Sequence, residues 1–310
     1  MADLTYNKLI YSALELYRKG RFEESYDLLT ENMDRVGGNK AQIFNFRYCS
    51  ACRMGRPDLA LDLLMESVED RGYWYSYDYL LSDDDLAPLR NNPDFQALAS
   101  VCRERESKAK SAAKTELRIL RQTGGGERGL LIALHGNGEN FEIAEGAWTS
   151  ALGCGFDVAL VQSSQITFTE GYEWSDLDRG IKDLRQQIRL LKRTYDLDRS
   201  SVVCGFSAGA RIALASMLRK EIVPRKLVLV GPWLPDLDFW TDNIVDLGQL
   251  ERFSCDVVCG TDDTDCFSHA KRLSELLDEG GVRHTLRLVD GLAHDFPDDF
   301  DEYLVKLLRT

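Results

Sequence analysis

The chain has 310 residues, enough for about two domains. With 44% hydrophobic and 29% charged residues, its composition is ordinary for a globular protein, and no apolar run approaches the ~18 residues that span a bilayer. The net charge of −13 argues against a nucleic-acid partner. The N-terminus has no basic region followed by an apolar one, so we expect no signal peptide and a cytoplasmic location.

The cysteines are spread along the chain rather than clustered. Cys204 and Cys259 fall inside predicted strands, as expected for reduced thiols that pack as small hydrophobic groups. Cys49 and Cys52 form a C-x-x-C pair, but this pair lies in a helical pattern and no second pair follows at zinc-binding spacing. The sequence therefore predicts a reducing compartment and no cysteine-based metal site.

Residues 5–110 show helical periodicity and almost no strand signal. Two stretches, 13–29 and 48–64, are alike: each has a glycine (Gly20 or Gly55), then arginine, a small residue and a leucine pair. This pattern resembles a tetratricopeptide repeat, which is a pair of helices joined by a turn, with a period near 34. About two repeats are visible where three are usually needed, so we expect this unit to depend on the domain that follows.

A dense group of aromatic residues follows the second repeat, and it has two interpretations. The group could line a substrate gorge or peptide groove, or it could pack between helices, and we favour packing. A charged stretch at 103–114 then reads as a helix end or linker, which places a domain boundary near residue 112. We therefore expect a helical domain at 1–112 and a second domain at 113–310. The aromatic residues are Tyr73, Trp74, Tyr75, Tyr77 and Tyr79.

The second domain alternates between strand and helix patterns. This alternation predicts an α/β fold with a mostly parallel sheet and helices on both faces. The first strand alternates in polarity, as in an antiparallel edge, and a turn at 123–128 follows it. Strands are predicted at 116–122, 129–134, 157–162, 201–204, 226–230, 256–259 and 283–289, and helices at 141–152, 176–195, 211–220, 267–278 and 300–309.

The stretch Gly205-Phe206-Ser207-Ala208-Gly209 matches G-x-S-x-G and lies between a predicted strand and a predicted helix. In this context a serine can project from a strained turn as a nucleophile. The glycines let strand and helix approach closely. The backbone N–H of Ala208, in the first helical turn, can then face a developing oxyanion.

From about residue 114 to its end, the chain resembles an α/β-hydrolase, closest to the carboxylesterase and lysophospholipase-like branch. The resemblance implies a nucleophile, an acid and a histidine in that chain order. Several features carry it together with the serine motif. They are His135-Gly136-Asn137-Gly138 after an early strand, Trp174 before a helix, Asp196-Leu-Asp-Arg199 before the serine strand, Gly260-Thr-Asp-Asp263, and Gly291-Leu-Ala-His294 with Pro297.

A serine hydroxyl needs a base beside it at neutral pH. Of the four histidines, His294 follows the last strand and should share the sheet edge with Ser207. The acid should follow the preceding strand, where Asp262, Asp263 and Asp265 compete. The resemblance selects Asp263, three residues after the strand-ending glycine, with Asp262 as the alternative. The acid would orient His294 and stabilise its cation.

The resemblance also implies an oxyanion hole built from the backbone N–H groups of Asn137 and Ala208. His135 belongs to the same loop, and we expect it to brace that loop. The side chain of Asn137 would either add a donor or only shape the loop. Such a site needs neither a metal nor an organic cofactor.

We expect a serine hydrolase that cleaves carboxylic esters through a Ser-His-Asp triad and an acyl-enzyme, with a small-molecule ester as substrate. The helical domain would either cap the site or bind a peptide or protein partner. One alternative is a thioesterase or peptidase that uses the same triad, because fold alone does not decide substrate. Another is a helical-repeat adaptor with an inactive hydrolase-like domain.

Overall fold

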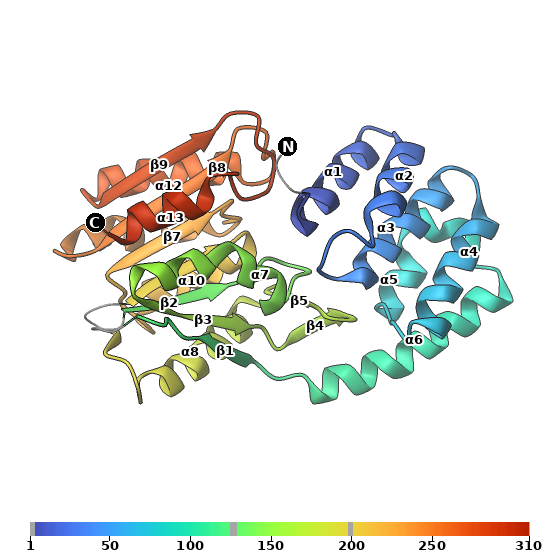
Figure 1. Ribbon diagram of the computed structural model, residues 1–310, viewed down its shortest axis with the longest axis horizontal. Coiled ribbons are helices and arrows are strands. Elements are labelled where there is room, and N and C mark those ends of the chain that lie inside the picture. Colours follow the sequence, from blue (N-terminus) through green and yellow to red (C-terminus); the bar gives the residue numbers. More distant parts are fainter. Residues whose placement is uncertain (1–3, 125–128, 198–200, 310) are drawn as a thin grey trace. The chain divides into compact units, whose positions relative to one another are not determined.

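The computed structural model describes residues 4–124, 129–197 and 201–309. The chain forms two compact units (Figure 1). The first contains the residues up to Ala113 together with Ile166–Tyr172, and the second contains 114–165 and the residues from Glu173 onward. A short segment from the middle of the chain therefore belongs to the helical unit. Part of the predicted turn, 125–128, lies outside the described residues, as do Asp198 and Arg199.

The first unit is helical, and its first four long helices form two hairpins. Each hairpin turns at a glycine, Gly20 or Gly55, whose φ is +74° or +72°. The small residues Ser25 and Ala60 are fully buried, and each hairpin consists of two helices joined at the glycine turn. The helices are α1 Tyr6–Arg18, α2 Phe22–Asn32, α3 Lys40–Arg53, α4 Pro57–Met65, η1 Glu66–Asp70, α5 Tyr77–Ser82, η2 Asp84–Leu89 and α6 Pro93–Ala112.

The aromatic group after the second hairpin forms part of the core of this unit. Trp74 and Tyr75 are buried, and the Tyr75 ring meets that of Tyr48 edge to face with centroids 5.3 Å apart. The Tyr75 hydroxyl donates to the Ala41 carbonyl at 3.0 Å, so its polar end is satisfied inside the core. The favoured interpretation of this group as inter-helix packing fits these contacts.

A two-stranded hairpin, β4 Gln165–Phe168 and β5 Gly171–Glu173, supplies the middle segment of the helical unit. Ile166 and Phe168 pack against the core of that unit. The Thr169 Oγ1 accepts the Trp74 N–H at 2.7 Å, and the Thr169 N–H donates to the Trp74 carbonyl at 3.0 Å. Asn39, which caps α3, also donates its Nδ2–H to the Thr169 carbonyl at 2.8 Å. Thr169 thus ties the hairpin to two separate segments of the helical unit.

The second unit contains a seven-stranded sheet in the order β1-β3-β2-β6-β7-β8-β9. β1 pairs antiparallel with β3, and the other neighbouring pairs are parallel, as the strand–helix alternation predicted. The central strands are buried along their length, which explains their continuous apolar runs. The strands are β1 Glu116–Leu120, β2 Gly129–Leu134, β3 Phe156–Gln162, β6 Ser201–Phe206, β7 Lys226–Val230, β8 Ser254–Gly260 and β9 Arg283–Val289.

Helices cover both faces of this sheet. Alternate strand residues such as Ile132 and Val203 share one core with α8, α10 and α12. On the other face, the ring centroids of Phe206 and Phe296 lie 4.7 Å apart. Close by, Trp148 of α7 packs against Phe300 of α13. The remaining elements are α7 Phe141–Trp148, η3 Thr149–Cys154, α8 Leu177–Leu191, α10 Ala208–Leu218, η4 Leu237–Trp240, α11 Thr241–Val245, η5 Asp246–Gln249, α12 Phe267–Glu279 and α13 Phe300–Leu308.

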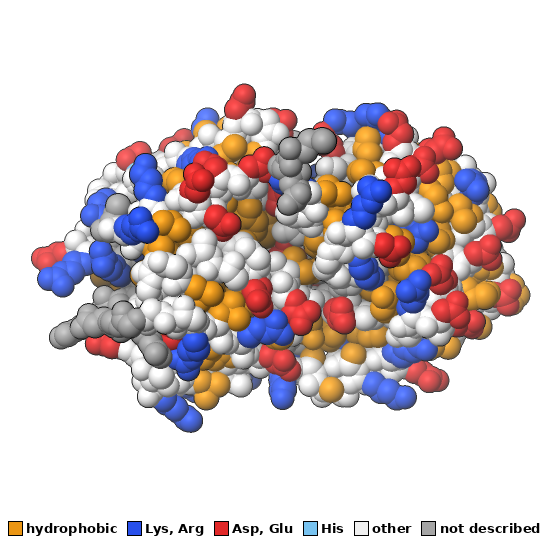
Figure 2. Space-filling view, in the orientation of Figure 1, with side chains coloured by type: hydrophobic (Ala, Val, Ile, Leu, Met, Phe, Trp, Pro, Cys, Tyr) orange, Lys and Arg blue, Asp and Glu red, His pale blue; other side chains and the backbone are white. Residues whose placement is uncertain are grey.

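Acidic and basic side chains are interspersed over the face shown in Figure 2. The net charge of −13 is therefore not gathered into one acidic field on this face. Within the described ranges, no helix combines the length and the apolar character needed to cross a bilayer.

Replacing Thr169 with valine should destabilise the helical unit. Thr169→Val keeps the side-chain shape but leaves the Trp74 N–H without its 2.7 Å acceptor, which should lower the free energy of unfolding by about 1–3 kcal/mol. Urea denaturation followed by Trp fluorescence measures this change. Thr123→Val, at an exposed position, is the matched control and should change stability by less than about 0.5 kcal/mol. Equal stabilities for the two variants would contradict the role given to Thr169.

Candidate active site

Ser207 occupies a sharp turn between β6 and α10. Its φ of 53° and ψ of −121° lie in a region that side-chain-bearing residues rarely adopt. The turn is possible because of its two glycines. A Cβ on Gly205 would lie 2.4 Å from the Ala210 nitrogen, and one on Gly209 would lie 2.4 Å from the His135 carbonyl oxygen. The sequence motif thus has the strained strand–turn–helix geometry expected of it.

The loop after β2 packs directly on this turn. Besides the contact of Gly209 with the His135 carbonyl, a Cβ on Gly136 would come within 2.9 Å of the Phe206 ring. Ala208 is the first residue of α10, where backbone N–H groups have no acceptor within the helix. The structure therefore brings the segments that carry Asn137 and Ala208 together.

The Asn137 side chain shapes its loop. Its Oδ1 accepts the backbone N–H of Trp174 at 2.8 Å. The indole N–H of the buried Trp174 donates to the His135 carbonyl, also at 2.8 Å. Trp174, which the sequence singled out only by resemblance, thus holds both ends of the short loop from His135 to Asn137.

His135 is buried and acts as a brace within this loop. Its Nε2 accepts the Ser163 N–H at 3.2 Å, so its Nδ1 carries the proton and donates to the Gly136 carbonyl at 2.7 Å. Burial lowers the pKa of His135 to about 4, far below that of an ordinary imidazole. The ring is therefore neutral near pH 7, and both of its nitrogens form hydrogen bonds that hold the loop in place.

Asp263 and His294 form a close pair beyond the ends of β8 and β9. Asp263 Oδ2 lies 2.7 Å from His294 Nδ1, and the Asp263 side chain is only 1% exposed. Asp263 Oδ1 accepts the Cys266 N–H at 3.1 Å, which fixes the carboxylate from its other side. By contrast, Asp262 and Asp265 are exposed. Of the three candidate acids, Asp263 is the one that the structure places beside His294.

Gly231, at the end of β7, links this pair to the serine turn. The Ser207 N–H donates to the Val230 carbonyl at 3.0 Å, which sets Ser207 alongside Gly231. A Cβ on Gly231 would lie 3.2 Å from His294 Nδ1 and 3.3 Å from Asp263 Oδ2. Sequence reasoning missed this residue, although a glycine directly after an apolar strand was a visible signal. Ser207 therefore lies at the same carboxyl edge of the sheet as the pair of Asp263 and His294.

The other two histidines have structural partners. His269 Nδ1 accepts the Leu234 N–H at 3.3 Å, and burial lowers the pKa of this imidazole. His284 lies 2.9 Å from the Ser274 hydroxyl and 3.0 Å from the Val282 carbonyl. Neither lies in the pair with Asp263.

Asp263, His294 and Cys266 also form a group whose donor atoms lie within 4.8 Å of one another. A metal ion there would displace the hydrogen bond between Asp263 and His294. It would also need the Cys266 thiolate, whose formation burial opposes by raising the thiol pKa. The donor set therefore suits a hydrogen-bonded acid–histidine pair better than a metal.

Comparison with known proteins supports a hydrolase fold. The family model "A/B hydrolase-like, N-terminal domain" matches residues 5–110. The tetratricopeptide-like interpretation of this segment is not confirmed. The crystal structure of an uncharacterized protein from Bacillus cereus is 34% identical, covers 99% of both chains and has a TM-score of 0.56.

Two esterase structures resemble part of the chain. The carboxylesterase from Mesorhizobium loti is 19% identical over 64% of this chain and 96% of its own, with a TM-score of 0.52. The Bacillus cereus carboxylesterase is 17% identical over 66% of this chain and 97% of its own, with a TM-score of 0.50. These likenesses concern the fold. No curated protein matches the chain.

The buried His135 should make stability depend on pH. Its pKa is about 4 in the folded protein and about 6.5 in the unfolded chain, so the unfolded chain binds the proton first as the pH falls. The stabilisation is complete above pH 6.5 and declines toward pH 4, by about 2 kcal/mol between pH 7 and pH 5.

The test is to measure the free energy of unfolding at several pH values for the wild type and for His135→Gln. The His135→Gln variant should lose about 2 kcal/mol of this pH dependence. A His135→Gln variant with the wild-type pH dependence would contradict the assignment of a buried, neutral His135.

Proposed function

The chain belongs to the same family as the uncharacterized Bacillus cereus protein and has an α/β-hydrolase fold, and on that premise we propose that it is a serine hydrolase that cleaves carboxylic esters. The observation that carries the proposal is the 2.7 Å contact between Asp263 and His294, set against Gly231 beside the strained Ser207. An acid, a base and a nucleophile held at one sheet edge are the parts that acyl transfer requires.

In the proposed mechanism, the Ser207 hydroxyl attacks the ester carbonyl while His294 Nε2 takes its proton. Asp263 accepts the Nδ1–H of His294, which leaves Nε2 free to act as the base and stabilises the imidazolium. His294 then protonates the leaving alcohol, and an acyl-enzyme remains on Ser207. Water, activated by the same histidine, releases the carboxylic acid and restores the serine.

The negative charge that develops on the carbonyl oxygen would be met by the backbone N–H groups of Ala208 and Asn137. Ala208 is the first residue of α10, so its N–H comes with the positive end of the helix dipole. The Asn137 side chain already accepts the Trp174 N–H, so we propose its backbone N–H as the donor to the oxyanion. Removing one such donor typically costs on the order of 10²–10³ in kcat.

The substrate class rests on the fold and on the names of two structural relatives. Both the Mesorhizobium loti and the Bacillus cereus structures are named carboxylesterases. The same triad can also cleave thioesters and amides, so the class of bond is settled by comparing rates. The acyl and alcohol preferences are set by residues around the site rather than by the triad.

Hydrolysis of p-nitrophenyl esters of increasing acyl length tests the proposal. The wild type should turn over, and Ser207→Ala should lose on the order of 10⁴-fold or more in kcat because the nucleophile is gone. Ser268→Ala, an exposed serine on α12, is the matched control and should keep wild-type activity. A thioester and a peptide amide of the same acyl group, measured in parallel, identify the preferred bond.

Either of two results would overturn the proposal. One is equal hydrolysis by wild type and Ser207→Ala, which would place the activity elsewhere. The other is no turnover of any ester, thioester or amide by a folded wild-type protein, which would favour an inactive hydrolase-like domain.

A further inference from the structure

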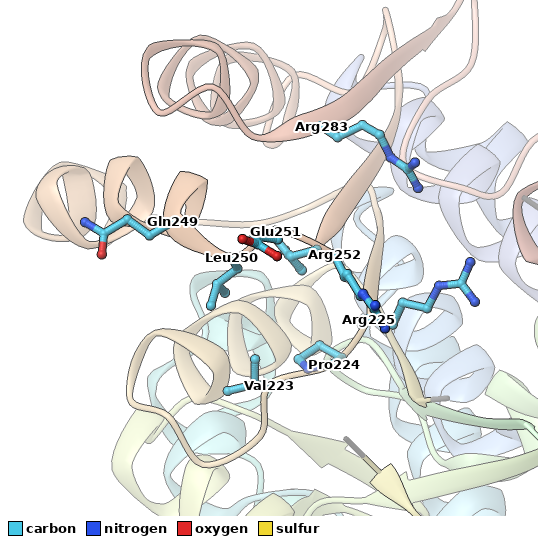
Figure 3. Close-up of a pocket in the computed structure, with 9 residues that line it drawn as sticks. Val223, Pro224, Arg225, Gln249, Leu250, Glu251, Arg252 and Arg283 are labelled. Carbon is cyan, nitrogen blue, oxygen red and sulfur yellow. The ribbon is translucent and has the colours of Figure 1, made fainter. Parts of the chain in front are cut away.

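A cavity lies at the amino ends of the parallel strands, opposite to the end where Ser207 lies. It has a volume of about 960 Å³ and is lined by the segments that precede three neighbouring strands (Figure 3). Val223–Arg225 leads into β7, Gln249–Phe253 leads into β8, and Arg283 begins β9. Ser207, Asp263 and His294 lie beyond the other ends of strands β6, β8 and β9, so this cavity is separate from the candidate active site.

Three arginines from three separate segments converge on this cavity. Lys226 pairs in register with Ser254, and Ser254 with Arg283, which sets the starts of β7, β8 and β9 side by side. The Ser254 N–H also donates to the Arg225 carbonyl at 3.1 Å. Figure 3 shows the side chains of Arg225, Arg252 and Arg283 extending to the same side of the cavity. The strand register therefore places the three arginines at neighbouring strand starts, on one side of the cavity (Figure 3).

The cavity carries an excess of positive charge. Among the lining residues that the structure describes, Glu251 is the one carboxylate beside the three arginines. Within the described part of the chain, Arg252 and Arg283 form no salt bridge, although the sequence holds 51 acidic against 38 basic residues. Several other arginines, such as Arg185 and Arg287, do pair with carboxylates. Two guanidinium groups are thus available to an anion from outside.

The opposite side of the cavity is apolar. Val223 and Leu250 are 42% and 36% exposed, which is high for large aliphatic side chains. They lie away from the three arginine side chains in Figure 3. The volume of the cavity lies within the range of small-molecule sites. Its ligand should therefore combine an anionic group with an apolar one.

We propose that this cavity binds an organic phosphate. The phosphate dianion would lie among Arg225, Arg252 and Arg283, because planar guanidinium groups bond phosphate oxygens in pairs. The two positive charges of Arg252 and Arg283 match a phosphate dianion better than a carboxylate monoanion. The organic part of the ligand would cover Val223 and Leu250. The proposal does not depend on hydrolase activity, because it uses none of the residues of the candidate active site.

Isothermal titration calorimetry with phenyl phosphate tests the proposal. Inorganic phosphate and phenol probe the anionic and the apolar part of that ligand separately. Phenyl phosphate should bind the full-length wild type, and inorganic phosphate should bind more weakly because it lacks the apolar group. The double variant Arg252→Gln/Arg283→Gln should weaken binding of phenyl phosphate about tenfold or more. Leu250→Ser should reduce the advantage of phenyl phosphate over inorganic phosphate.

Arg189→Gln is the matched control, because Arg189 is an exposed arginine of the same unit, on α8 and outside the cavity. It should bind phenyl phosphate like the wild type, and circular dichroism should show that all variants are folded. The absence of phenyl phosphate binding by the wild type would overturn the proposal. Binding that survives in the double variant, or that falls equally in Arg189→Gln, would overturn it as well.

Discussion

The candidate site depends on glycine at positions 205 and 209, where there is no room for a Cβ. Any Cβ at either position would overlap backbone atoms, including the His135 carbonyl oxygen. Only this close approach lets α10 start directly after β6, which forces Ser207 into its positive-φ turn. The same approach presses the loop of His135 to Asn137 against the turn. One packing contact thus positions both the Ser207 turn and the loop that we propose holds the oxyanion.

Two separate groups of residues lie at the opposite ends of the parallel strands. Beyond the carboxyl ends of the strands lie Ser207, Asp263 and His294, and Gly231 packs closely against the last two. Before the amino ends of β7, β8 and β9 lie the three arginines and an apolar wall. Because neighbouring parallel strands start together and end together, residues far apart in sequence gather at each edge. Of these two groups, only the one at the carboxyl ends of the strands has a recognisable sequence motif.

Most of the second unit was predictable because each buried strand is a continuous apolar run, as at Gly129–Leu134 and Lys226–Val230. The hairpin Gln165–Glu173 was not, because strands of four and three residues are too short to show a period. The sequence ranked Asp263 above Asp262 only by resemblance, and burial beside His294 supplies the physical distinction. The arginine cavity has no signal in sequence, since its residues converge only through strand register.

Labelling with a fluorophosphonate, followed by peptide mapping, tests the central claim most directly. If Asp263 and His294 activate Ser207, the label will attach to the peptide that contains Ser207. Asp263→Asn should then slow labelling by ~10²-fold or more, because the base is no longer oriented, whereas Asp262→Asn should label at the wild-type rate. A label on another residue, or equal rates for the two aspartate variants, would contradict the account.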